Sequence, residues 1–411
     1  MHTKHARPVC SVAVPRFGPR AGMEGPHFPL GGPVPPEDLV GREPYLRQAT
    51  TRLAEGEHLL VAGPRRIGKT SVILEVLRRV RRRGAVTAYV DCFGATDIRG
   101  LGERLAGSLI SSLEGREGAI EDARGIARGL PPAGRIRYEH LELALPVVRD
   151  GPAQRAFEAA LDLPRTIASR TGKRVVVAFD EFQAAGRLGP RVFDLMRSHF
   201  QGQRGVAYAF LGSEEGLLEE LFGRKGRALY RFAVAHDLAQ AGGHRFGIDP
   251  ADWLAYLRRK LANKRIAIAE ADVDRILDLT GGHPQDTMQL CSALYHFMRD
   301  RSLRTVTSDL VAVAYEQALR ELERPFAMHW TDLGEQKWLQ AVAKRIAGGG
   351  PLYSARAQGD VPRAEVLRAV TGLAARGLVV RTGRGRYEFL EPMFGEHVRR
   401  LDRPAGIVPA R

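Results

Sequence analysis

The chain has few cysteines, few lysines and no long apolar run. Its 411 residues include three cysteines, Cys10, Cys92 and Cys291, which lie far apart without disulfide or zinc-ligand spacing. This argues against a disulfide framework or a zinc site and favours a reducing compartment. No apolar stretch approaches the ~18 residues of a membrane span, and the N-terminal region has no signal core. We therefore expect a cytoplasmic protein without a membrane segment.

The scarcity of lysine is matched by an excess of arginine. Only 8 of the 62 basic residues are lysine, and the formal net charge is +15. Such an excess is typical of proteins with an acidic partner such as nucleic acid. An arginine-biased genome would produce the same composition, so both explanations stay open until the position of the charge is considered.

The length predicts two or three domains. Residues 1–36 are rich in glycine, proline, arginine and histidine without periodicity, which indicates a flexible tail within which Met23 is an alternative start. Short apolar runs alternate with helical patterns over residues 37–245. From residue 246 onward, apolar residues recur mainly with the 3.6-residue period of a helix. We expect an α/β core over 37–245, a helical lid domain over 246–329 and a third unit over 330–411.

Four short apolar runs predict the buried strands of a parallel sheet that helices cover on both faces. The segment 114–152 is rich in glycine and arginine without clear periodicity, and we expect it to form a helical insertion with loops. The four predicted strands are 59–62, 86–90, 175–179 and 206–211.

A glycine-rich stretch follows the first predicted strand and precedes a helical pattern. Residues 63–70 read GPRRIGKT and fit G-x-x-x-x-G-K-T, in the context that a phosphate-binding loop requires. The glycines let the backbone approach a phosphate, and the start of the helix favours its negative charge. Lys69 would reach the terminal phosphates, and the Thr70 hydroxyl would complete the shell of a magnesium ion. The sequence thus predicts a nucleoside triphosphate site.

Two carboxylates follow the third predicted strand, in the stretch FDEFQ. Hydrolysis of a triphosphate needs a carboxylate that holds the metal and a group that orients water. Asp180 is the expected magnesium ligand, and Glu181 is the expected residue that polarises the attacking water. An apolar run that ends in two acids is also a common helix cap, but its place after the phosphate loop favours catalysis.

Six motifs lie in a fixed order over about residues 37–300: VGRE, GPRRIGKTS, FDEFQ, LGSEEGLLEELF, RALYR and TGGHPQDTMQL. In this order they resemble the archaeal-type ATPases, in the AAA+/STAND branch of the P-loop proteins, which occur in archaea and bacteria. The resemblance implies a P-loop NTPase core with an AAA+/ASCE-type parallel sheet, followed by a small helical lid. It also implies ATP and Mg²⁺ as cofactors.

The resemblance assigns roles to the first two motifs. Val40 and Gly41 would line the adenine pocket. Arg65 and Arg66 would neutralise the triphosphate or reach a neighbouring domain, and exposure to solvent is an equal alternative. The complete set of expected loop contacts is Gly63, Pro64, Arg65, Arg66, Ile67, Gly68, Lys69, Thr70 and Ser71.

The later motifs supply four more candidates. Ser213 follows the fourth predicted strand, where the family has a polar sensor of the γ-phosphate, although a serine there is also an ordinary cap. Arg231 falls at the position of the family's arginine, but Tyr230 replaces the usual glycine before it. His283 and Pro284 of GGHP would lie against the nucleotide, and a simple helix break is the alternative.

Positive charge is concentrated in the third unit. From Lys337 to Arg411 there are 14 basic and 6 acidic residues, a net charge of +8 (14 minus 6). The order helix, helix, hairpin is that of a winged helix, whose arginines suit DNA phosphates. Docking against the ATPase core, a protein client or a second copy is the competing interpretation. The candidate DNA contacts are Arg363, Arg368, Arg381, Arg384 and Arg386.

Three functions stay open at this point. The first is an ATPase whose lid and winged helix move with the nucleotide state and act on DNA or on a protein assembly. The second is a slow ATP/ADP switch with little turnover, and the third is a DNA-binding regulator with a vestigial nucleotide site. The set formed by Lys69, Thr70, Asp180 and Glu181 favours the first.

Overall fold

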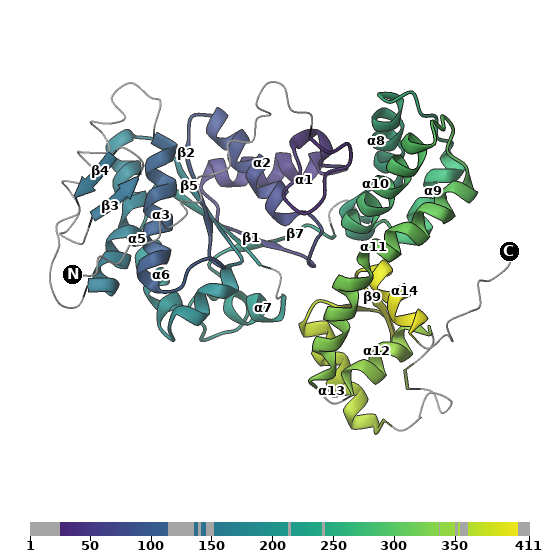
Figure 1. Ribbon diagram of the computed structural model, residues 1–411. Helices are drawn as coiled ribbons and strands as arrows, with labels where there is room; N and C mark the ends of the chain where they lie inside the picture. The colour runs from purple at the N-terminus through teal and green to yellow at the C-terminus, as the bar shows by residue number, and fades with distance from the viewer. Residues whose placement is uncertain are drawn as a thin grey trace, which may run out of the picture.

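The computed structural model has an α/β part, which contains the N-terminal half of the chain, and a helical part beside it (Figure 1). The α/β part consists of a sheet between two layers of helices, and the helical part extends away from one edge of that sheet. The residues that the structure describes are 25–113, 135–138, 141–144, 152–212, 215–240, 243–336, 338–349, 352–353 and 361–401.

Five parallel strands form the central sheet in the order β2-β5-β6-β1-β7. The four expected strands are confirmed, two of them extended by one residue. The fifth, β7, was not expected, because its residues VAHD are partly exposed and form no apolar run. The strands are β1 (Leu59–Ala62), β2 (Val86–Asp91), β5 (Val175–Asp180), β6 (Val206–Leu211) and β7 (Val234–Asp237).

Alternate residues of each strand pack under different helices. In β5, Val175, Val177 and Phe179 lie in the apolar cluster with α3, α5, α6 and α7, whereas Val176 and Ala178 lie in the cluster with α1 and α2. A strand that is buried on both faces needs a continuous apolar run, which explains why these strands were predictable. The helices are α1 (Glu43–Glu55), α2 (Lys69–Arg82), α3 (Ile98–Leu113), α5 (Pro152–Thr171), α6 (Val192–Phe200) and α7 (Glu215–Gly223).

The segment between α3 and α5 contains a β-hairpin. Strand β3 (Arg135–Tyr138) pairs antiparallel with β4 (Leu141–Ala144), at the side of the α/β part (Figure 1). The expected helical insertion over 114–152 is therefore wrong at these positions, and α5 already begins at Pro152. The sequences RIRY and LELA alternate with the period of a strand, a signal hidden by the surrounding glycines and arginines. The remaining residues of 114–151 lie outside the described ones.

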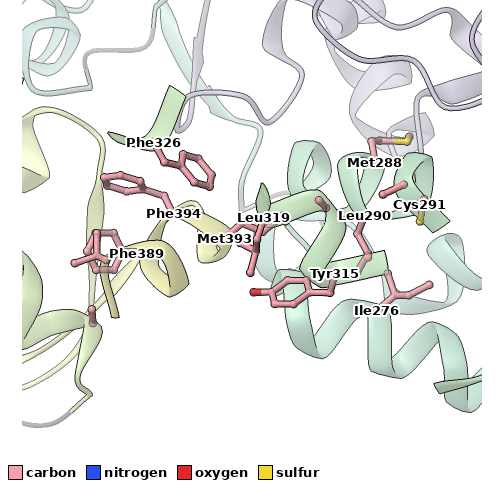
Figure 2. Packing of buried hydrophobic residues seen from close by; sticks show 14 of the residues in the cluster. Ile276, Met288, Leu290, Cys291, Tyr315, Leu319, Phe326, Phe389, Met393 and Phe394 are labelled. Carbon is pink, nitrogen blue, oxygen red and sulfur yellow. The ribbon is translucent and has the colours of Figure 1, made fainter. Parts of the chain in front are cut away.

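One buried apolar cluster runs through the described residues of the helical part. Figure 2 shows it passing from Ile276 and Cys291 past Met393 to Phe326 and Phe394. The expected boundary at 329/330 falls inside a helix, α11. In the described residues, no helix combines the length and the apolar character needed to cross a membrane. The elements are α8 (Pro250–Ala262), α9 (Glu270–Thr280), α10 (Pro284–Asp300), α11 (Ser308–Gly334), α12 (Leu339–Ala347), α13 (Arg363–Ala375), β8 (Val379–Gly383), β9 (Arg386–Phe389) and α14 (Pro392–Arg400).

Residues 25–36 pack against both parts. Phe28 is 2% exposed, and its ring centroid lies 6.3 Å from those of Tyr256 and Tyr295. Further along, the Val34 N–H donates to Ser71 Oγ at 3.0 Å. The expectation of a flexible tail is therefore wrong for this stretch, and residues 1–24 lie outside the described ones. Burial of the Phe28 ring thus orders a stretch whose glycine- and proline-rich composition predicts flexibility.

Candidate active site

A cavity of about 700 Å³ lies at the carboxyl end of the parallel sheet. This is the end at which α/β proteins of this kind bind their ligands, and the volume suits a small molecule. Its walls come from the N-terminal segment, the glycine-rich loop, two strand ends and the helical part. The lining residues used below are 29–34, Val40, Arg42, 65–71, Tyr89, Asp180, Glu181, Ile248, Trp253, Pro284 and Met288.

The glycine-rich loop curls around Lys69. The ammonium group of Lys69 donates to the carbonyls of Gly63 at 2.7 Å and Pro64 at 2.5 Å, so these two residues support the lysine and do not themselves line the cavity. A Cβ at Gly63, with φ of 136°, would lie 2.6 Å from Ile67 Cδ1, which requires glycine there. Gly68, with φ of 93°, precedes the first turn of α2, whose N–H groups can bind an anion.

Thr70 and Asp180 meet at the floor of the cavity. Asp180 Oδ2 accepts a hydrogen bond from Thr70 Oγ1 at 2.6 Å and another from the Tyr89 hydroxyl at 2.8 Å. Burial and the nearby Asp180 raise the pKa of Tyr89, which keeps this phenol a protonated donor. A carboxylate and a hydroxyl brought together beside a phosphate loop are oxygen ligands of the type that Mg²⁺ prefers. These two residues fit the expected metal.

Glu181 adopts an uncommon backbone conformation beside Asp180. Its φ of 46° is left-handed, and its N–H donates to Asp180 Oδ1 at 2.8 Å. Its carboxylate accepts a hydrogen bond from the Gln183 side-chain amide and lines the cavity. Backbone strain of this kind is common where a side chain is held for function. Ser213, the expected sensor, lies outside the described residues.

Arg42 is a site residue that the sequence reasoning missed. It is 2% exposed, and its guanidinium donates to the carbonyls of Ile67 at 2.9 Å, Leu238 at 3.1 Å and Phe246 at 2.7 Å. Burial lowers its pKa to about 10. Arg42 thereby joins the phosphate loop to the segment that leads into the helical part. The signal for Arg42 in the sequence was its place in the VGRE motif, directly before a glutamate.

The residues before Arg42 occupy different places. Val40 is 7% exposed and lines the cavity, as expected. Gly41 is not among the lining residues. A Cβ at Gly41 would lie 2.9 Å from Ile248 Cγ2, so this glycine allows the close approach of the chain that enters the helical part.

The helical part supplies the opposite wall. Ile248, Trp253, Met288 and Pro284 line the cavity, which agrees with the expected position of Pro284. His283 does not line it. Its side chain is fully buried and caps α10, since Nδ1 accepts the Asp286 N–H at 3.3 Å. Of the two candidates in the GGHP motif, Pro284 therefore lines the cavity, whereas His283 caps a helix.

Arg231 lies at the other end of the sheet. It precedes β7, which runs parallel to β1, whereas the phosphate loop follows β1. Its N–H donates to Phe222 O at 2.9 Å, and its guanidinium lies 5.9 Å from the Tyr230 ring. The structure therefore does not bring Arg231 to Lys69 and Asp180.

The two loop arginines both line the cavity, and Arg66 also contacts the C-terminal unit. Its Nη1 donates to Glu391 Oε2 at 2.5 Å, where Glu391 directly precedes α14. The sequence left open whether these arginines neutralise the triphosphate, reach a neighbouring domain or face solvent. Arg66 contacts a neighbouring unit. No signal near residue 391 could have indicated this partner, because 325 positions separate the two residues.

Comparison with known proteins relates the residues around this site to a described domain family. Residues 38–205, which contain VGRE, the phosphate loop and the Asp180–Glu181 pair, match the family model described as the AAA ATPase domain. Over these residues the chain is similar to AAA ATPase domains, and this similarity supports ATP hydrolysis as its activity. No curated protein matches this ATPase closely enough to add a more specific relative.

Solved structures share the fold of this ATPase beyond the matched domain. The Walker-type ATPase PABY2304 of Pyrococcus abyssi has a TM-score of 0.63 at 16% identity, over 91% of this chain and 99% of that chain. The ORC2 protein of Aeropyrum pernix, solved in ADPNP–ADP complexes, has a TM-score of 0.53 at 15% identity, over 90% and 96% of the two chains. The expected fold, a P-loop AAA+ parallel-sheet core followed by a helical region, is thereby confirmed.

Proposed function

We propose that this ATPase is Mg-dependent and that its nucleotide state moves the helical lid together with the basic C-terminal unit. One observation carries the proposal: a single cavity is walled by Lys69 and Thr70 on one side and by Trp253 and Pro284 on the other. A nucleotide in it would contact both parts. The affinity of the protein for the nucleotide would then differ between closed and open arrangements of these two parts. A ligand can shift a conformational equilibrium only through such a difference in affinity.

The residues take the following roles in this proposal. Lys69 binds the terminal phosphates, and Thr70 and Asp180 hold a magnesium ion, which would supply charge neutralisation. Glu181, fixed by Gln183, orients and polarises the attacking water. Ser213 keeps its proposed sensor role on the basis of the resemblance alone.

Steady-state phosphate release by a Glu181→Gln variant tests this proposal. We expect the rate to fall about 100-fold, because the amide cannot accept the proton of water, while ATP affinity stays within about threefold. Glu103→Gln is a matched control, since Glu103 is exposed on α3, does not line the cavity and pairs with Arg99. Equal rates for the wild type and Glu181→Gln would remove Glu181 from the mechanism.

We propose DNA as the partner of the C-terminal unit, which we take as a winged helix. The five candidate arginines are all exposed in the structure, two on α13 and three on the β8–β9 hairpin. On the same two elements, Leu367 of α13 is 59% exposed and Val380 of β8 is 40% exposed. A basic helix beside a basic hairpin can contact phosphates on either side of a groove.

Duplex binding over a range of salt concentrations tests this partner. Charge reversal of Arg384 and Arg386 together should weaken binding at least about tenfold and reduce the salt dependence, because two phosphate contacts are lost. Arg99→Glu is the control, since Arg99 is exposed on α3 in the other part of the molecule. Unchanged affinity in the double variant would favour docking against a protein.

Two observations favour a second candidate, a slow ATP/ADP switch with little turnover. Arg231 lies away from the cavity, and Arg66 is engaged by Glu391. With Arg231 distant and Arg66 engaged, Arg65 is the remaining cavity-lining arginine of these three, and hydrolysis would be slow if its side chain does not reach the γ-phosphate. The nucleotide content of the purified protein distinguishes the candidates: retained ADP supports the switch, whereas rapid multiple turnover by a monomer contradicts it.

A further inference from the structure

Arg66 is held by a carboxylate from outside the α/β part. The Nη1 to Oε2 distance to Glu391 is 2.5 Å, and the exposed fractions of the two side chains are 46% and 11%. Arg66 has a left-handed φ of 63° and lines the cavity beside Arg65. The charge of an arginine at the rim of the phosphate loop is therefore compensated by a different unit of the molecule.

Glu391 is itself fixed to the lid. Two residues further on, the Met393 N–H donates to Asp286 Oδ2 at 2.9 Å, and Asp286 is 3% exposed in the first turn of α10. A Cβ at Gly281 would lie 3.0 Å from Pro392 Cγ, so the backbone at Gly281 passes close to this junction. The stretch 391–393 thus contacts the phosphate loop and the lid at the same time.

A histidine of α11 faces the same pair. Burial lowers the pKa of His329, Glu391 acts in the opposite direction, and Arg66 and Arg65 lower it further. Its ring stacks on Phe394 with centroids 4.9 Å apart. At neutral pH the imidazole is therefore uncharged, and it adds no positive charge that would compete with Arg66 for Glu391.

We propose that Glu391 is a positioning residue of the nucleotide site and that it competes with the terminal phosphate of ATP for the guanidinium of Arg66. Guanidinium groups bind carboxylates and phosphates through the same donors. ATP places an additional phosphate at the rim of the loop, so it weakens the Arg66–Glu391 contact more than ADP does. The inference rests on the proposed function, because it requires a nucleotide in this cavity. It adds the residue through which the C-terminal unit responds to the number of phosphates.

Equilibrium titrations of the full-length protein with ADP and with a non-hydrolysable ATP analogue, both with magnesium, test this inference. We expect Glu391→Gln to tighten analogue binding about fivefold relative to ADP, because Arg66 is released. Arg66→Gln should weaken the analogue relative to ADP by a similar factor. The double variant should match Arg66→Gln within about twofold, since Glu391 acts only through Arg66.

Glu388→Gln is the matched control, because Glu388 lies on β9 and pairs with Arg245 at 3.3 Å, outside the phosphate loop. We expect the ratio of its affinity for the ATP analogue to its affinity for ADP to equal that of the wild type. An unchanged ratio in Glu391→Gln, or an equal change in the Arg66→Gln background, would overturn the inference. If Glu391→Gln does not fold, an unchanged ratio in Arg66→Gln overturns it as well. Failure of the wild type to bind either nucleotide would instead overturn the proposed function.

Discussion

The two ends of the central sheet use polar side chains in different ways. At the carboxyl end, Lys69, Asp180 and Glu181 line a cavity of about 700 Å³. At the amino end, His58 is half-buried and held by packing: its Nδ1 accepts the Tyr208 N–H at 3.2 Å, and its ring stacks 4.5 Å from Phe232. The sheet therefore places polar groups around a ligand site at its carboxyl end and against packed aromatic side chains at its amino end. We expect substitutions at the first end to change binding and at the second to change stability.

The largest expected effect is that of Lys69→Ala on nucleotide affinity. Loss of the ammonium removes charged hydrogen bonds to the terminal phosphates, and we expect affinity for ATP to fall about 100-fold, or about 3 kcal/mol. Calorimetric titration measures this loss. Lys173→Ala is the matched control, because Lys173 is exposed at the amino end of β5. A tenfold loss in the control would contradict the functional separation of the two ends.

A smaller effect concerns stability and pH at the amino end. Burial, and secondarily Arg197, lower the pKa of His58 to about 4 from an ordinary 6.5. The unfolded chain therefore takes up a proton at His58 that the folded chain does not, so stability from this group is complete above pH 6.5 and is lost as the pH falls toward 4. Because the ring is partly exposed, we expect a loss of only about 1–2 kcal/mol.

Urea unfolding at pH 7 and pH 5 measures this loss. His58→Gln keeps a hydrogen-bond acceptor but does not titrate, so its two curves should lie closer together than those of the wild type. ATP affinity at pH 7 should be the same in both proteins. A pH dependence that is unaltered in His58→Gln would show that other groups are responsible.

The smallest expected effect is that of Arg231→Ala. Because Arg231 precedes β7 at the amino end, we expect ATP affinity and phosphate release of the dilute protein to change by less than about twofold. Measurement over a range of protein concentrations sharpens the comparison. A loss of activity that grows with concentration would show that Arg231 acts on the nucleotide of a second copy.

The sequence predicted the carboxyl end of the sheet better than the walls that complete the site. Lys69, Thr70, Asp180 and Glu181 could be identified because each follows a buried strand, and the carboxyl ends of parallel strands meet at one edge. Trp253, Met288 and Glu391 could not, since their positions depend on packing between segments far apart in the chain. Phe28 and the hairpin β3–β4 were hidden by local composition. Strand β7 lacks the apolar run from which the other strands were recognised.

The length of α11 sets how far the movement that we propose for the lid would be transmitted. This helix has 27 residues, with Pro325 inside it, and runs from the lid to the C-terminal unit, so it spans about 40 Å. It lies within one apolar cluster that joins both ends, so we expect the two regions to move together. A rotation of about 10° at the lid would displace the far end by about 7 Å, roughly the separation of two base pairs along a DNA duplex.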